Sequence, residues 1–168
     1  TYMPKKKELV LPKFGYSIEH CQISLLGNGL INNTYLVKTI DKTFVLQCLN
    51  QQVFTTPLNV TNNADQISSH LKVKSDNGRY ALTPICQLHT TDNKNHVVVQ
   101  GQYWRSLHYI SDCYTVESIT NAEQGSAVAN AFAQFAAALS DFDSENLAEI
   151  IPQFHDLSLQ IGQLNQAI

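Results

Sequence analysis

The stretch LLGNGLINNTYLV, residues 25–37, places two glycines around one asparagine and leads into an alternating apolar run. Glycine permits positive φ and removes the side chain that would keep a ligand away from the backbone. Consecutive backbone N–H groups in such a loop can bind an anion such as a phosphate. A simple hairpin turn is the other interpretation, because a lone Gly-x-Gly is weakly specific. The neighbouring elements decide between the two.

The other residue types that could do chemistry show no spacing typical of a site. The six histidines form no i, i+4 or His-Glu-x-x-His pair, which argues against a metal site. The four cysteines form no Cys-x-x-Cys unit, so reduced thiols are favoured over a disulfide framework. Asp141, Asp143 and Glu145 lie in a polar segment, where carboxylates usually cap helices or face solvent.

The first hundred residues have the pattern of a mostly antiparallel sheet. Residues 34–40 alternate with a period of two, which is typical of a strand with one buried face. Asp41-Lys42 suits a tight turn before the next strand, and Gly101 suits a second hairpin. The expected strands are residues 23–26, 34–40, 44–49, 96–100 and 102–110.

Helical patterns occur once among these strands and again near the end of the chain. Pro57 can begin a helix that runs to about residue 74. Its apolar face would carry Val60, Ala64, Ile67 and Leu71. Residues 122–142 predict a long helix with an apolar stripe of Val128, Phe132, Phe135 and Leu139. Shorter helices are expected before Pro152 and over the final residues.

Length and composition limit the possible functions. At 168 residues the chain has the length of one domain or of two small lobes, and 43% hydrophobic residues can form a core. The net charge of -3 gives no electrostatic reason to expect nucleic acid or an anionic membrane as partner. No apolar run approaches the roughly 20 residues that cross a bilayer. Without a signal-peptide pattern a cytoplasmic location is expected, and Lys5 to Lys7 would form a solvated tail.

The order of the expected elements is that of a protein-kinase-like small lobe: strand, glycine loop, hairpin, helix, two strands and a connector into helices. Four segments resemble the aminoglycoside phosphotransferase and choline kinase superfamily, and most of all bacterial N-acetylhexosamine 1-kinase-type sugar kinases. These segments are LGNGLINNTYLV, FVLQCLNQQVF, YWRSLHYI and FAQFAAALSDFDSENLAEIIPQFHD. The resemblance extends from about residue 23 to residue 156.

The resemblance implies an α+β fold, with a small lobe of about five antiparallel strands and one helix followed by the first helices of a truncated large lobe. The implied divisions are a nucleotide-binding lobe at residues 1–110, a hinge or connector at 111–118, and the start of the helical lobe at 119–168. The implied activity is ATP-dependent phosphoryl transfer to the anomeric hydroxyl of an N-acetylhexosamine. ATP and Mg²⁺ would be its cofactors, with the metal ligands in the missing lobe.

The resemblance also implies where ATP would bind. The glycine loop would cover the phosphates, and the backbone of residues 107–112 would contact adenine. The implied ATP-binding residues are Gly27, Asn28, Gly29, Leu30, Asn32, Asn33, Thr34, Gln47, His108, Tyr109 and Ile110. Gln47 stands where many relatives carry Lys or Arg, and a neutral amide provides no charge. The acid that pairs with that lysine in protein kinases would fall near Asn62, with Asp65 one turn on.

The catalytic half of the family pattern is missing. His155-Asp156 lacks the family's residue between His and Asp, and no Asn follows at the required spacing. The chain is therefore expected to be the N-terminal part of a sugar kinase, inactive alone and without a catalytic residue or metal ligand. Its exposed 122–142 helix could cause self-association. A non-catalytic nucleotide-binding module or pseudokinase is the alternative, and an unrelated interaction domain is disfavoured by four family segments in the right order.

Overall fold

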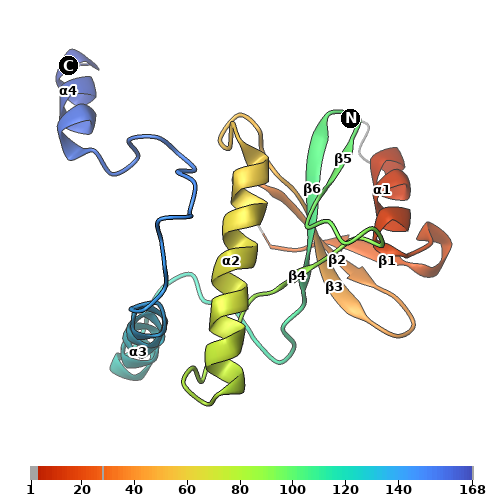
Figure 1. The fold of residues 1–168 in the computed structure, drawn as a ribbon, viewed down its shortest axis with the longest axis horizontal. Coiled ribbons are helices and arrows are strands. Elements are labelled where there is room, and N and C mark those ends of the chain that lie inside the picture. The colour runs from red at the N-terminus through yellow and green to blue at the C-terminus, as the bar shows by residue number, and fades with distance from the viewer. Residues whose placement is uncertain (1–3, 28, 168) are drawn as a thin grey trace.

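A six-stranded antiparallel sheet forms the centre of the computed structural model, which describes residues 4–27 and 29–167 (Figure 1). Its strands are β1 (Gln22–Leu25), β2 (Asn33–Lys38), β3 (Thr43–Cys48), β4 (Gln87–Leu88), β5 (Val97–Val99) and β6 (Gln102–His108). Strands β1, β2 and β3 pair in sequence order, and β6 pairs with β3. The short strands β4 and β5 each pair with β6. The predicted α+β class is confirmed, with β4 as a strand that the sequence pattern did not predict.

One face of the sheet is covered by the N-terminal helix α1 (Pro4–Val10) and the 3₁₀ turn that follows it, Leu11–Phe14. Val10 and Leu11 are fully buried in the main apolar cluster, together with Trp104 of β6. The amine of Lys7 lies 3.6 Å from the centroid of the Tyr35 ring. The expectation of a solvated tail at Lys5 to Lys7 was therefore wrong, because these lysines belong to a helix that closes the core.

The opposite face carries the long helix α2 (Pro57–Asp76), which contacts β4 and β6 (Figure 1). The helix is where the sequence predicted it, but its most buried side chains include Thr61 and Ser68, whereas Val60 is only half-buried. The Thr61 hydroxyl donates to the Leu58 carbonyl at 2.9 Å. Because hydroxyl groups can be satisfied within the helix itself, polar residues can occupy the buried stripe.

Both predicted hairpins are present. The Thr39 N–H donates to the Lys42 carbonyl at 2.8 Å, which closes the turn between β2 and β3. Between β5 and β6, Gln100 and Gly101 have φ of 50° and 75°. Two consecutive positive φ values are typical of the tight hairpin turn whose twist matches the flanking strands. The second of the two is a glycine, the residue that adopts this conformation without steric cost.

The C-terminal third contains α3 (Ala122–Ala138) and α4 (Leu157–Ala167), of which α3 lies beside α2 (Figure 1). The Asn121 side chain caps α3 by accepting from the Gln124 N–H at 2.9 Å. Helix α3 ends before the predicted residue 142. The short helix expected before Pro152 is not formed: Asp143 Oδ1 instead accepts from the Glu145 N–H at 3.1 Å and stabilises a turn.

Side-chain contacts from α2 hold the segment that follows α3. The Asn63 amide donates to the Ala148 carbonyl at 2.7 Å and accepts from the Ala148 N–H at 3.0 Å. Ala138 is buried in a small second cluster with Leu71 and Tyr80. The apolar stripe of α3 is mostly outside this cluster, since Phe132 remains 72% exposed.

None of the helices in the described part of the chain is both long and apolar enough to cross a bilayer. All four cysteines are free thiols; Cys48 lies in the main core, whereas Cys113 is exposed.

Candidate functional site

The glycine loop between β1 and β2 has an open face. Gly27 has a φ of 70°, and a Cβ built on it would meet no atom within 4 Å. The Leu26 N–H donates to the Thr34 carbonyl at 3.0 Å and closes the base of the loop. Leu30 is fully exposed and Gly29 is also at the surface, whereas Asn28 lies outside the described residues. At Gly27 the loop therefore leaves room for a ligand to approach the backbone.

Two of the expected ATP-binding side chains anchor the loop to the sheet. Asn32 Oδ1 accepts from the Asn50 N–H at 2.9 Å, just beyond β3. The Thr34 hydroxyl accepts from the Gln47 amide Nε2 at 3.0 Å. Asn33 is exposed at the start of β2. Because Asn32 and Thr34 already make these bonds, their structural role is to fix the position of the loop.

A polar row crosses the α2-facing side of the sheet. Thr34, Gln47 and Arg105 are directly opposite one another on β2, β3 and β6. The Arg105 Nε donates to Gln47 Oε1 at 2.9 Å, so the three side chains form one continuous chain of hydrogen bonds. With neighbouring strands about 4.8 Å apart, the row spans roughly 10 Å. It leads from the glycine loop toward the space beneath α2.

Sequence reasoning gave Arg105 no role. Strands β3 and β6 are distant in the sequence, and only their pairing reveals that an arginine stands opposite Gln47. Burial lowers the pKa of the Arg105 guanidinium. An arginine nevertheless stays charged in proteins, so the row contains a cation beside the neutral Gln47.

A cavity of about 460 Å³ lies between α2 and β6. Its lining residues are Ala64, Ile67, Ser68, Leu71, Tyr80, Leu82, Thr83, Pro84, Ile85, Arg105, Leu107, Ile110 and Phe135. Arg105 is the only charged residue among them. A volume of this order with mostly apolar walls and few polar groups is typical of small-molecule sites.

The expected hinge follows β6. The His108 N–H donates to the Cys86 carbonyl at 2.9 Å, whereas the N–H groups of Tyr109 and Ile110 donate to no described residue. Of the three hinge residues expected to contact ATP, only Ile110 lines the 460 Å³ cavity. His108 instead lines a separate hollow of about 350 Å³ with Asp76. Burial, with a smaller effect of Lys42, lowers the pKa of His108 and favours its neutral ring.

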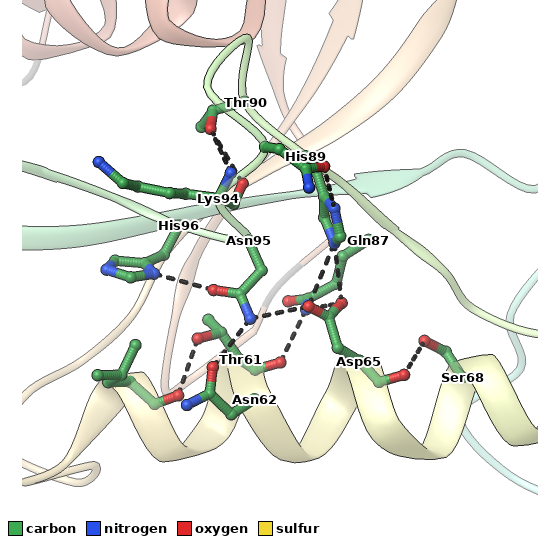
Figure 2. Close-up of polar contacts among 12 residues, drawn as sticks. Thr61, Asn62, Asp65, Ser68, Gln87, His89, Thr90, Lys94, Asn95 and His96 are labelled. Carbon is green, nitrogen blue, oxygen red and sulfur yellow. Dashed lines mark hydrogen bonds and ion pairs between the residues drawn. The ribbon is translucent and has the colours of Figure 1, made fainter.

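Asp65 is held by a different set of partners (Figure 2). Its carboxylate accepts hydrogen bonds from Gln87 Nε2 at 2.6 Å and Asn95 Nδ2 at 2.8 Å, and His89 Nε2 lies 3.2 Å away. Asn62 Oδ1 accepts from the same Asn95 amide at 3.0 Å. Asn62 and Asp65, the two candidate positions for the acid of protein kinases, are therefore both hydrogen-bonded to β4 or to the residues between β4 and β5. Among the described residues, neither makes a hydrogen bond to Gln47.

The described residues contain no group of three or more histidines, cysteines and carboxylates that could hold a metal ion.

No protein-family model matches the chain. One solved structure with partial similarity is spectinomycin phosphotransferase, APH(9)-Ia, in complex with ADP and spectinomycin. The identity is 14% and the TM-score is 0.45, over 76% of this chain and 36% of that enzyme. The chain thus spans about a third of the length of that enzyme.

Proposed function

We propose that this chain is the nucleotide-binding part of an ATP-dependent small-molecule kinase. The nucleotide would bind across the α2-facing side of the sheet, with its phosphates at the glycine loop and its base against the hinge backbone. The observation that carries the proposal is the hydrogen-bonded row of Thr34, Gln47 and Arg105, which extends from the open loop to the cavity beneath α2. The sequence motifs of residues 25–37 and 103–110 support the same assignment.

The glycine loop and the hinge, at the two ends of the proposed site, suit the phosphates and the base of a nucleotide. At the loop, Gly27 leaves room for close approach of a phosphate to the backbone. At the hinge, the N–H groups of Tyr109 and Ile110 donate to no described residue and can donate to the polar edge of a base. Leu107 offers an apolar surface to the ring of that base. Residues 1–110, 111–118 and 119–168 would be the nucleotide-binding lobe, the hinge and the start of the helical lobe.

The proposal includes an acceptor and a limit on activity. The acceptor would be the anomeric hydroxyl of an N-acetylhexosamine, and the enzyme would be cytoplasmic. The 168-residue chain should bind ATP and transfer no phosphate, because its sequence contains no His-x-Asp motif for a catalytic aspartate. Mg²⁺ would arrive with the nucleotide, and no ligand for it is assigned in this chain.

Replacing Gly27 tests the loop. Gly27→Ala places a methyl group in the open space where a phosphate should approach, and we expect ATP affinity to fall by about 10-fold, or about 1.4 kcal/mol. Gly78→Ala is the matched control, because Gly78 has the same φ of 70° and equally open surroundings at the end of α2. Isothermal titration calorimetry with ATP and Mg²⁺ measures both variants.

Equal affinities of the two variants would contradict the assignment of the loop, and a wild-type chain that binds no ATP would contradict the proposed function. The wild-type chain should then be incubated with ATP, Mg²⁺ and N-acetylglucosamine or N-acetylgalactosamine. Formation of a sugar 1-phosphate would show that the expected lack of activity is wrong.

A non-catalytic nucleotide-binding module or pseudokinase is the second candidate. It is favoured by Gln47 at the position of the usual lysine and by the bonds that hold Asp65 to Gln87 and Asn95. Without that lysine–acid pair, binding can persist while transfer is lost. Such a protein would bind ATP. It would form no sugar 1-phosphate, even in a longer form that carries a complete helical lobe.

The exposed stripe of α3 predicts self-association. Val128, Phe132 and Phe135 are 40%, 72% and 40% exposed, and apolar surface of this kind favours association. We expect the chain to form larger species as concentration rises, and Phe132→Glu to shift it toward monomer in multi-angle light scattering. A wild-type monomer over a wide concentration range would contradict this expectation.

A further inference from the structure

Arg105 is a partly enclosed cation for which no described residue provides an anionic partner. None of the ion pairs formed by the described residues includes it, although Lys72, Lys74 and Lys94 all have carboxylate partners. The only side-chain hydrogen bond that Arg105 makes to a described residue runs from its Nε to Gln47 Oε1. Charged groups removed from water are normally paired with an opposite charge. The guanidinium is therefore suited to bind an anion that none of the described residues supplies.

Gln47 fixes the orientation of this cation. Its Nε2 donates to the Thr34 hydroxyl, and this bond turns Oε1 toward the Nε of Arg105. The Arg105 Nε–H is consequently occupied, while the two Nη groups make no hydrogen bond to a described residue. Neither Nη nitrogen is among the buried unpaired polar atoms, so both remain accessible. Two parallel N–H donors of one guanidinium match the oxygens of a phosphate.

The surroundings of Arg105 favour a ligand with an apolar part as well as an anionic part. The same side chain lines the 460 Å³ cavity, whose remaining walls are uncharged. The Gln47 and Thr34 side chains connect it to the base of the glycine loop. An anion bound here would therefore lie between an apolar cavity and the base of the glycine loop, where Gly27 has open surroundings.

We propose that Arg105 is the phosphate-binding cation of the nucleotide site, replacing the strand lysine that this chain lacks, and that Gln47 is a positioning residue that holds Arg105. This inference rests on the proposed nucleotide-binding function. The positive charge is displaced by one strand, from β3 to the opposing position on β6, and reaches the ligand through the two Nη groups. Gln47 supplies no charge and acts through Arg105.

Arg105→Gln tests the assignment. We expect the affinity for ATP and for tripolyphosphate to fall by about 10- to 100-fold, because a hydrogen bond to a charged group is lost. Adenosine should bind equally to wild type and variant, since it carries no phosphate. Lys38→Gln on β2 is the matched control, because it removes an exposed cation from the same sheet and should leave all three affinities unchanged. Calorimetry of the full 168-residue chain gives each affinity.

Moving the positive charge from β6 back to β3 distinguishes a phosphate-binding role of Arg105 from a purely structural one, because only the binding role predicts that ATP affinity recovers. In the double variant Gln47→Lys with Arg105→Gln, the cation returns to β3, and we expect ATP affinity to recover by at least about 5-fold over Arg105→Gln alone. Arg105→Lys keeps the charge and should lose less than Arg105→Gln. If Arg105→Gln does not fold, Arg105→Lys is measured instead. The expected result is then a loss of ATP affinity with adenosine binding unchanged.

The outcomes separate the two proposals. If wild type binds ATP and Arg105→Gln binds it equally well, the assignment of Arg105 is wrong and the nucleotide function stands. An equal loss for ATP and adenosine would indicate a merely structural arginine and would also overturn the assignment. Wild type that binds tripolyphosphate as tightly as ATP, with no affinity for adenosine, would contradict the nucleotide function while retaining Arg105 as an anion site. Wild type that binds none of the three would overturn both.

Discussion

Trp104→Ala should lower the free energy of unfolding by about 3–5 kcal/mol, the usual cost of removing a large aromatic side chain from a core. Trp104 is fully buried on β6 and stacks on Tyr35 with ring centroids 6.2 Å apart. Its position on the strand that pairs with β3 and β5 places it where the sheet and α1 meet. Urea unfolding followed by far-ultraviolet circular dichroism suits this test, because the variant lacks the only tryptophan.

Two controls make the Trp104 result specific. Trp104→Phe should lose at most about 2 kcal/mol, because it keeps an aromatic ring and removes an indole N–H that has no partner among the described residues. Tyr114→Ala removes an aromatic ring that is 84% exposed and should change stability by no more than about 0.5 kcal/mol. A Trp104→Ala chain within about 1 kcal/mol of wild type would contradict the described core.

Asp65→Ala should destabilise the fold by about 1–3 kcal/mol, because it removes the shared acceptor of several side chains. Gln87 is 7% exposed, and its Nε2 donates both to Asp65 and to the Thr61 carbonyl. Loss of the carboxylate leaves a donor of this nearly buried amide without its partner (Figure 2). The network joins α2 to β4, so its loss should loosen the contact between the helix and the sheet.

Asp76→Ala is the control for Asp65→Ala. Asp76 lies on the same helix, but its ion pair with Lys72 is exposed on both sides and should contribute at most about 0.5 kcal/mol. Chemical denaturation of the two variants side by side gives the comparison. Equal stabilities of the two would show that the contacts of Asp65 do not hold α2 on the sheet.

Much of the fold could be predicted from local patterns. The period of two over residues 34–40 marks β2 because one face of that strand is buried, and Gly101 marks a hairpin because its φ is positive. Helix α1 could not be found in this way, since the lysines at positions 5–7 conceal the apolar contacts of Val10 and Leu11. The buried face of α2 also differs from the predicted one. Thr61 and Ser68 can be buried there because their hydroxyl groups donate to backbone carbonyls of the same helix.

The candidate site was only partly predictable for a related reason. The glycine loop is a local feature, and its residues could be named from the sequence. The role of Arg105 depends on the pairing of β3 with β6, which no local pattern specifies. The same holds for Asp65, whose partners Gln87 and Asn95 come from a segment beyond α2. Contacts between residues that are distant in the sequence require the fold before they can be assigned.

The central claim is that a nucleotide binds across the α2-facing side of the sheet, from the glycine loop to the hinge. Titration of the ¹⁵N-labelled chain with ATP and Mg²⁺, followed by two-dimensional NMR, tests it most directly. We predict shifts in the amide signals of Gly27, Thr34, Tyr109 and Ile110 and in the Nε–H signal of Arg105. Signals of Val10 and Leu11, on the opposite side of the sheet, should stay unchanged. Shifts centred on the α1 side or on α4, or no shifts at all, would contradict the account.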